Sequence, residues 1–166
     1  MMPHHRILVF LFLLLISARV PAVTLTGRIV GVSDGDTLTL LDAEHVQHKI
    51  RVAGIDAPEK QQPFGEKAKL SLSALTYNRT VEADCRKVDR YRRNVCVVFV
   101  GGMDVGLDQV KAGMAWWYRQ YAKEQTSRER IDYEQAESQA KLRRHGLWNS
   151  ADQTPPWEWR RDRRRR

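Results

Sequence analysis

Acidic side chains lie on two short segments of this 166-residue chain in a pattern that could hold a cation. Asp34 and Asp36 flank a glycine in the segment SDGD, and Asp56 and Glu59 follow the strand-like segment KIRVAGI. If the SDGD turn lies beside the end of that strand, Asp36 and Asp56 meet, and carboxylates held close repel each other unless a cation joins them. Hard oxygen ligands select Ca²⁺ or Mg²⁺ over softer metals. The pattern predicts a divalent cation site, although an Asp-Gly pair is also ordinary turn chemistry.

Arginines accompany these carboxylates. Ile50 and Val52 share one face of the predicted strand, so Arg51 points to the opposite face. The segment DRYRR, residues 89–93, carries more arginines between two further strands. A cation and planar guanidinium groups together offset the charge that grows when water attacks an anionic phosphodiester, and a nearby carboxylate can deprotonate that water. Each residue alone is equally consistent with a solvated surface charge.

Five predicted strands would position these residues. Segments 23–32, 37–41 and 48–55 are rich in β-branched residues and are separated by short turns, which favours an antiparallel meander. Residues 80–85 alternate apolar and polar side chains, and residues 94–100 form a further apolar run. A hairpin loop joins these last two strands.

Three helices complete the predicted fold. Phe64, Ala68, Leu72 and Leu75 share one helical face, which places a helix between the third and fourth strands. A short helix over about 105–112 and a longer one over about 128–144 follow, each ending near a glycine. The fold class is therefore α+β, and the order of elements is that of a five-stranded OB-fold barrel with three helices.

Both ends of the chain differ in composition from its middle. Residues 1–22 combine a short basic start, the apolar run 7–16 and a small-residue pattern ending at Ala22, which predicts a cleaved signal peptide rather than a membrane anchor. The formal charge is +8, or +6 without this leader, which contributes two arginines and no acid. Residues 151–166 form an irregular, Arg-rich tail in this prediction. Such a tail is typical of a solvated end and also fits a handle for a polyanion.

Cys85 and Cys96 are the two cysteines of the chain. Antiparallel pairing across the hairpin sets them opposite each other, at a distance that a disulfide can bridge. An even cysteine count in an exported chain favours the disulfide, while two buried free thiols are the alternative. A zinc site is not expected, because two cysteines without nearby histidines do not supply four ligands.

Several motifs in one order make the chain resemble the staphylococcal nuclease, or thermonuclease, family. The matching segments are DGDTLTL, IRVAGIDAPE, DRYRR, LDQVKAGMAWWYRQY and YEQAESQAKLRRHGLW, within residues 23–148. The resemblance implies an OB-fold over residues 23–150 and a small secreted Ca²⁺-dependent endonuclease that cleaves DNA and RNA. It also implies a disulfide around the arginine-bearing hairpin.

The resemblance assigns roles by position. Asp36 and Asp56 would supply carboxylates to Ca²⁺, and Ala57 would supply its backbone carbonyl. Asp34 would lie behind these ligands without binding the ion directly. Glu59 matches the glutamate proposed as general base.

It also assigns the residues that hold the substrate. Arg51 and Arg93 match the two arginines that bind the phosphate. Tyr91 and Tyr121 would flank the nucleic acid, and Arg119 lies among the aromatic residues of AWWYRQY, a segment that suits either base stacking or core packing.

One departure leaves two interpretations open. The family usually has glycine where this chain has Arg92, and glycine tolerates backbone angles that arginine adopts at a cost. Either Arg93 keeps the catalytic position and Arg92 points outward, which strand alternation favours, or the loop shifts and Arg92 takes the role or activity falls.

The predicted function is therefore a secreted or periplasmic, calcium-dependent nuclease of low sequence specificity that leaves 3′-phosphate ends. We expect DNA and RNA as its substrates, a monomer without a stable protein partner, and no membrane span after removal of the leader. The alternative is an OB-fold module that binds nucleic acid and cleaves it weakly or not at all.

Overall fold

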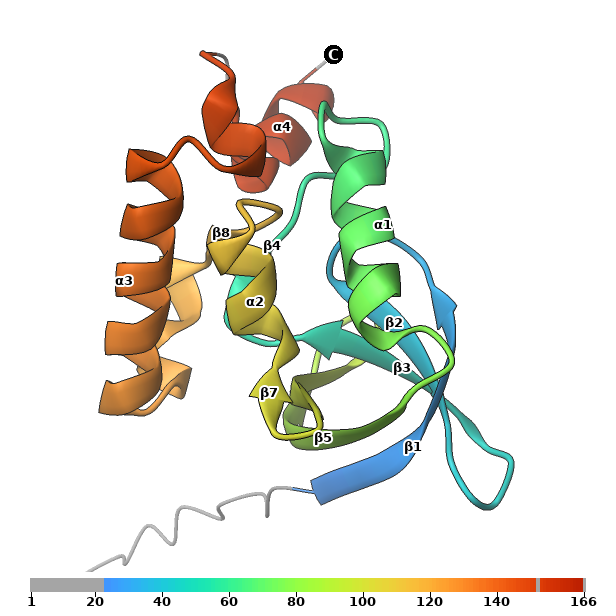
Figure 1. Cartoon of the computed structure of the whole chain (residues 1–166). Coiled ribbons are helices and arrows are strands. Elements are labelled where there is room, and N and C mark those ends of the chain that lie inside the picture. The colour runs from blue at the N-terminus through green and yellow to red at the C-terminus, as the bar shows by residue number, and fades with distance from the viewer. Residues whose placement is uncertain (1–22, 152, 166) are drawn as a thin grey trace, which may run out of the picture.

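A five-stranded barrel forms the centre of the computed structural model, which describes residues 23–151 and 153–165 (Figure 1). The predicted signal peptide lies outside these residues. The strands pair in the order β3-β2-β1-β5-β6, and a parallel pairing of β3 with β6 closes the barrel. This architecture confirms the predicted α+β barrel. Its strands are β1 (Val23–Val32), β2 (Thr37–Leu41), β3 (Gln47–Val52), β5 (Thr80–Val88) and β6 (Asn94–Val100).

Alternation along the strands builds the core of the barrel. Ile29, Leu38, Leu40, Ile50 and Val98 are completely buried. Burying side chains of this size contributes about 1.5–3 kcal/mol each, which fixes the register of the strands, since a one-residue slip would expose this face.

The register of β2 on β3 matters most for function. Thr37, the first residue of β2, lies opposite Arg51 near the end of β3. The SDGD turn that precedes β2 is therefore held beside the end of β3. A short strand, β4 (Ile55–Asp56), follows after a turn and pairs with β8 (Trp116–Trp117). The single third strand predicted over 48–55 is thus two strands separated by a turn at residues 53–54.

Three helices lie close to the predicted positions: α1 (Gly65–Thr76), α2 (Val105–Lys111) and α3 (Ser127–Leu142). Helices α1 and α2 pack against the barrel, and α3 packs against α2 and β8. Thr126 caps α3 in a capping box with Glu129, and the Asp104 side chain accepts the Leu107 N–H at the start of α2. The remaining short elements are β7 (Met103–Asp104), η1 (Arg119–Glu124) and η2 (Gly146–Asn149).

A buried glutamine ties these helices to the SDGD turn. The side chain of Gln109 on α2 donates to the backbone oxygens of Gly35 and Ala68, at 3.1 and 3.0 Å. Because buried polar groups are costly to leave unpaired, these bonds fix the turn against α1 and α2.

The predicted cysteine pair is a disulfide in the structure. Cys85 on β5 lies directly opposite Cys96 on β6, with 2.09 Å between the sulfur atoms. The bond joins the two strands that carry the hairpin of residues 89–93.

The C-terminal segment differs from the irregular tail that the sequence predicted. Residues Pro156–Arg163 form a helix, α4, which begins with a proline at its first position, where the missing N–H has no helical partner to lose. The helix packs back onto the domain near the start of α1 (Figure 1). No helix in the described ranges is both long and apolar enough to cross a membrane.

Candidate active site

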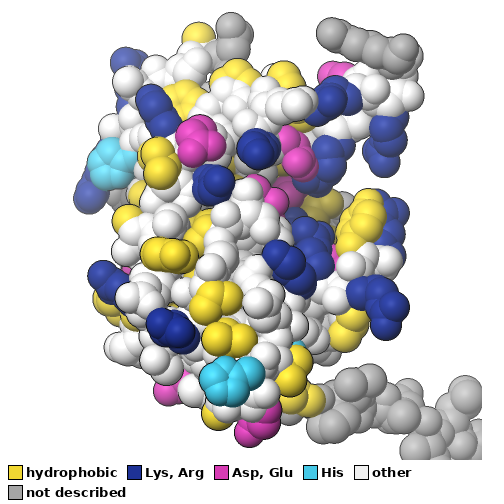
Figure 2. Space-filling model, turned by 90° about the vertical axis from the view of Figure 1, so that its right-hand side faces the viewer, with side chains coloured by type: hydrophobic (Ala, Val, Ile, Leu, Met, Phe, Trp, Pro, Cys, Tyr) yellow, Lys and Arg dark blue, Asp and Glu magenta, His cyan; other side chains and the backbone are white. Residues whose placement is uncertain are grey.

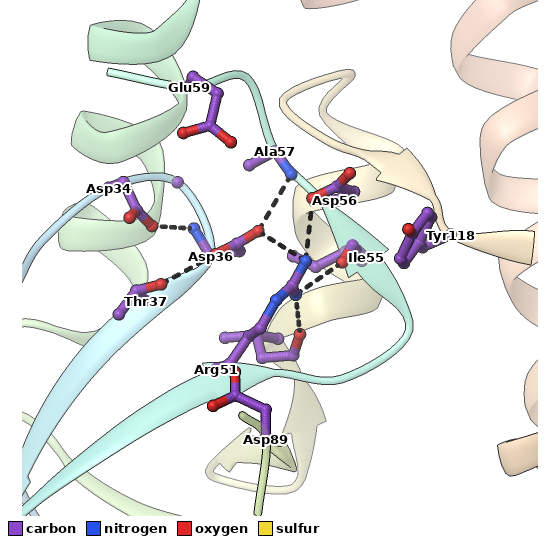
Figure 3. Close-up of polar contacts among 12 residues, drawn as sticks. Asp34, Asp36, Thr37, Arg51, Ile55, Asp56, Ala57, Glu59, Asp89 and Tyr118 are labelled. Carbon is purple, nitrogen blue, oxygen red and sulfur yellow. Dashed lines mark hydrogen bonds and ion pairs between the residues drawn. The ribbon is translucent and has the colours of Figure 1, made fainter. Parts of the chain in front are cut away.

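Asp36 stands at the start of β2, with both carboxylate oxygens directed by neighbouring groups (Figure 3). Its Oδ1 accepts the Thr37 hydroxyl at 2.9 Å, and its Oδ2 accepts the Ala57 N–H at 3.3 Å. Asp34 Oδ1 in turn accepts the backbone N–H of Asp36 at 3.0 Å. The turn and the segment after β4 are therefore joined through one carboxylate.

The guanidinium of Arg51 brings the two predicted cation ligands together. Its Nη2 lies 2.9 Å from Asp56 Oδ1 and 3.3 Å from Asp36 Oδ2, while Nη1 donates to the backbone oxygens of Val52 and Ile55 at 3.2 and 3.0 Å (Figure 3). Asp36, just before β2, and Asp56, on β4, thus lie on the same guanidinium nitrogen, so the turn does lie beside the segment that carries Asp56.

Burial and mutual repulsion raise the pKa values of Asp34 and Asp56. Burial, together with the charge of Asp36, raises the pKa of Asp34 to about 6. Burial also raises the pKa of Asp56, despite its hydrogen bonds from arginine. The same carboxylates raise the pKa of Arg51 against the effect of its own burial. The three aspartates form a site with an excess of negative charge that a cation would relieve.

The donor set fits a hard divalent cation. Asp36 and Asp56 offer carboxylate oxygens (Figure 3), and Ala57, the next residue after Asp56, has a backbone oxygen of the kind that such cations accept. Within the described ranges no group of three or more His, Cys, Asp or Glu side chains is arranged to hold a metal. A cation at this place would therefore rely on backbone or water oxygens besides the two carboxylates, a pattern usual for Ca²⁺ and Mg²⁺ and foreign to zinc.

Glu59 lies on the loop beyond Ala57 and contacts an arginine that the sequence did not place here. Arg160 of α4 donates from Nη1 to Glu59 Oε1 at 2.7 Å, and from Nη1 and Nη2 to Asp56 Oδ1 and Oδ2 at 3.2 and 2.7 Å. Its carboxylate partners raise the pKa of Arg160 despite partial burial. Asp56, which is completely buried, is therefore held between Arg51 and Arg160.

The hairpin of residues 89–93 directs Arg93 toward the same centre. Arg93 donates from Nε to Asp89 Oδ2 at 2.8 Å and from Nη1 to the Thr37 hydroxyl at 3.1 Å, and that hydroxyl donates to Asp36. Arg92 is exposed and has a φ of 63°, in the left-handed region that suits glycine. The positions of the two side chains favour the interpretation in which Arg93 faces the site and Arg92 points outward.

The predicted aromatic contacts divide into two groups. Tyr91 and Tyr121 are exposed, with Arg93 near the ring of Tyr91 and Lys87 near that of Tyr121. Trp116 and Trp117 are buried and belong to the core.

Arg119 forms an ion pair with another part of the protein, and its predicted contact with nucleic acid stays a prediction. Its Nη1 lies 2.8 Å from Oε2 of the buried Glu137, and its guanidinium covers the ring of Trp117. These contacts do not show a place for Arg119 in the carboxylate cluster.

Tyr118 is the aromatic residue that sequence reasoning missed. It lies next to Asp56 (Figure 3), and burial together with the Asp56 charge raises the pKa of its hydroxyl. Its place in AWWYRQY was the available signal, but only the pairing of β4 with β8 shows which ring of that segment reaches the site.

Charged side chains surround the face shown in Figure 2. Lysine and arginine side chains are spread over it, and several acidic side chains lie among them in the upper half of the view. This distribution suits a surface that approaches an anionic polymer while keeping its carboxylates for a cation.

Comparison with known proteins assigns the fold to a family. The family described as "Staphylococcal nuclease homologue" matches residues 49–150, well over half of the chain. The chain belongs to the staphylococcal nuclease family. As a member it is a phosphodiester hydrolase of the endonuclease type, as its motifs predicted.

Several relatives cover most of this staphylococcal nuclease homologue. An "Uncharacterized endonuclease" of Haemophilus influenzae is 42% identical over 136 residues, 82% of this chain and 73% of the relative. The "Micrococcal nuclease" of Shigella flexneri is 37% identical over 144 residues, covering 81% and 80%. "Protein ParB" of Escherichia coli is 36% identical over 148 residues, covering 83% and 80%.

Proposed function

We propose that this staphylococcal nuclease homologue is a Ca²⁺-dependent enzyme that hydrolyses DNA and RNA with little sequence preference and leaves 3′-phosphate ends. The observation that carries the proposal is the meeting of Asp36 and Asp56 around the guanidinium of Arg51. The carboxylates supply the charge that a cation needs, and the arginine remains beside it for an anionic phosphate.

Each residue of the cluster has a defined task in this account. Asp36, Asp56 and the Ala57 carbonyl would hold the cation, which when bound would offset negative charge on the phosphate. Arg51 and Arg93 bind phosphate oxygens, because a planar guanidinium matches their geometry and stays charged at any working pH.

The remaining groups complete the active site. Glu59 accepts a proton from the attacking water as general base. Asp34 holds the backbone of Asp36 through its hydrogen bond and so keeps the ligand in place. Tyr91, Tyr118 and Tyr121 offer aromatic faces for bases, which every nucleotide can use, and this fits low sequence specificity.

We further propose that the protein works as a monomer in the periplasm or outside the cell. Support comes from the signal-peptide pattern of residues 1–22 and from the Cys85–Cys96 disulfide, since disulfides persist in oxidising compartments.

The second candidate function is nucleic-acid binding with weak cleavage. The arginine at position 92 in a left-handed conformation favours it, since strain at that hairpin bears on the placement of Arg93. The basic tail would then supply much of the affinity, with a steep dependence on salt.

One assay separates the two functions. Plasmid DNA and an RNA transcript are incubated with the purified protein in Ca²⁺, Mg²⁺ or EDTA. The 5′ and 3′ ends of the products are then labelled enzymatically, before and after phosphatase treatment, to show which end carries the phosphate. We expect rapid degradation in Ca²⁺, none in EDTA, and 5′-hydroxyl with 3′-phosphate ends. Asp56→Asn should abolish cleavage, while Glu44→Gln, at an exposed turn, should leave it unchanged. Full digestion in excess EDTA would contradict the cation requirement, and tight binding without cleavage would support the second candidate.

A further inference from the structure

Helix α4 binds the carboxylates that the proposed function reserves for the cation and the water. Arg160 contacts both oxygens of Asp56 and one of Glu59, all within 3.2 Å. Of the arginines in the described part of the tail, residues 151 and 153–165, Arg160 alone makes these contacts. Arg161, its neighbour, is exposed and lies 3.8 Å from Asp162 (Nε to Oδ1).

Aromatic packing holds α4 beside the site. Trp157 lies one helical turn before Arg160 and stacks on Tyr118, with 5.5 Å between ring centroids and 23° between planes. It also meets Trp116 edge to face at 6.4 Å. Because side chains three apart share a helical face, the same face of α4 carries the aromatic anchor and the guanidinium.

A buried glutamine connects the segment before α4 to the loop that carries Glu59. The side chain of Gln62 accepts the backbone N–H of Glu59 at 3.1 Å and donates to the backbone oxygen of Thr154, just before α4. The loop that carries Glu59 and the segment that leads into α4 are therefore held by one residue.

These contacts conflict with a loaded active site. A divalent cation needs at least one oxygen of Asp56, but both are bonded to Arg160 and one is also bonded to Arg51. A guanidinium at this distance repels an incoming cation. Arg160 also engages one of the two Glu59 oxygens, which hinders an approaching water there, and Trp157 stacks on the Tyr118 ring that a base would use.

We propose that α4 is an autoinhibitory cap, in which Arg160 and a divalent cation occupy the Asp56–Glu59 carboxylates in turn. Cation binding displaces Arg160, and α4 then leaves the site open to nucleic acid. The inference rests on the proposed function for the position of the cation and for the roles of Glu59 and Tyr118. It gives the helical tail a role in controlling the site, in addition to any general attraction of its exposed arginines for a polyanion.

Calcium affinity measured by titration calorimetry tests the competition. We compare the purified protein with Arg160→Gln and, as the matched control, Arg161→Gln on the exposed side of the same helix. Arg160→Gln should bind Ca²⁺ at least tenfold more tightly, because its carboxylates are no longer held by a cationic side chain, and Arg161→Gln should match the unmodified protein. Equal affinity in all three would overturn the cap, and weaker binding by Arg160→Gln would instead make Arg160 a supporting residue of the cation site.

Hydrogen exchange on the unmodified protein tests the same proposal without any substitution. Saturating Ca²⁺ should speed amide exchange in residues 156–163 while leaving the barrel strands protected. Unchanged or slower exchange in α4 under saturating Ca²⁺ would contradict displacement of the helix. If neither the protein nor Arg160→Gln binds Ca²⁺, the proposed cation site itself fails, which is distinct from Ca²⁺ binding that leaves α4 in place.

Discussion

Arg51 and Arg160 both bind the carboxylate of Asp56, but they come from two very different parts of the molecule. Arg51 belongs to a central barrel strand, its side chain is 15% exposed, and it bonds to two backbone oxygens besides Asp56. Arg160 belongs to a short terminal helix, its side chain is 38% exposed, and its bonds go to the side chains of Asp56 and Glu59.

This difference indicates which of the two arginines is a fixed part of the site. Removing Arg51 would break bonds inside the barrel, so this arginine stays whatever else binds. The contacts of Arg160 are with the groups that a cation would take, so an ion can replace them. One carboxylate therefore has a permanent partner and an exchangeable one.

The largest effect should follow the loss of the permanent partner. Arg51→Ala removes the guanidinium that lies between Asp36 and Asp56, so the two carboxylates repel each other, and it also removes a phosphate-binding group. We expect plasmid cleavage to fall by about 10³-fold or more, and the free energy of unfolding to fall by about 3 kcal/mol, as for other broken buried ion pairs. Initial rates and urea denaturation measure the two effects.

Arg51→Lys separates charge from geometry at this position. It keeps the positive charge but loses the planar fork, so it should recover part of the stability and little of the activity. Full activity in Arg51→Lys would show that the fork is not required.

Two of the hairpin arginines, Arg93 and Arg92, give the next effect. Arg93→Ala should lower the cleavage rate by about 10²-fold, because its guanidinium is directed at Thr37 beside Asp36. Arg92→Ala, at the exposed neighbour, should remain within about twofold. Rates on one short single-stranded DNA compare them, and a larger loss in Arg92→Ala would mean that the hairpin presents the other arginine during catalysis.

The aromatic anchor of α4 should have a smaller effect that is opposite in sign. Trp157→Ala loosens the helix while leaving Arg160 in the chain, so Ca²⁺ affinity should rise by about threefold, equivalent to about 0.7 kcal/mol. Calorimetry measures this change. Weaker Ca²⁺ binding in Trp157→Ala would indicate that a docked α4 assists the ion.

The ion pair between Arg86 and Glu129, which lies outside the carboxylate cluster, should give the smallest effect and serves as a control. Burial raises the pKa of Glu129, but hydrogen bonds from Arg86 and the backbone of Thr126 outweigh it and lower the pKa below its usual 4.5. A lowered carboxyl pKa stabilises the fold above the unfolded-state pKa and stops doing so as the pH falls through the folded-state value.

The pair therefore has a defined pH dependence. Glu129→Gln should cost about 0.5 kcal/mol of unfolding free energy at pH 7 and progressively less as the pH falls below 4.5, with Ca²⁺ affinity unchanged. Thermal unfolding across this pH range measures the cost. The same loss at pH 3 as at pH 7 would show that the ion pair is not its source.

Local patterns predicted the barrel well, because alternating apolar residues and turn residues act over a few positions. The bounds of β1, β2 and β6 are those expected, and Asp36 and Asp56 meet because the turn before β2 must lie beside the end of β3. The facing of Cys85 and Cys96 followed from the same hairpin geometry.

Contacts between distant segments explain what the sequence did not predict. A run of arginines is equally suited to solvent, so the docking of Arg160 depends on Tyr118 and Asp56 being brought together by the pairing of β4 with β8. Arg119 pairs with the buried Glu137 of α3, a contact that its own segment of the sequence does not indicate, and its place near nucleic acid stays a prediction. The spacing of Trp157 and Arg160 carried a signal, which becomes meaningful only once their partners are known.

A crystal structure of the protein grown with Ca²⁺ tests the central claim most directly. We predict an ion bound between the carboxylates of Asp36 and Asp56, with Arg51 still in place and Arg160 withdrawn from Asp56 and Glu59. An ion bound elsewhere, or an ion at Asp56 while Arg160 keeps its bonds to both Asp56 oxygens, would contradict the account.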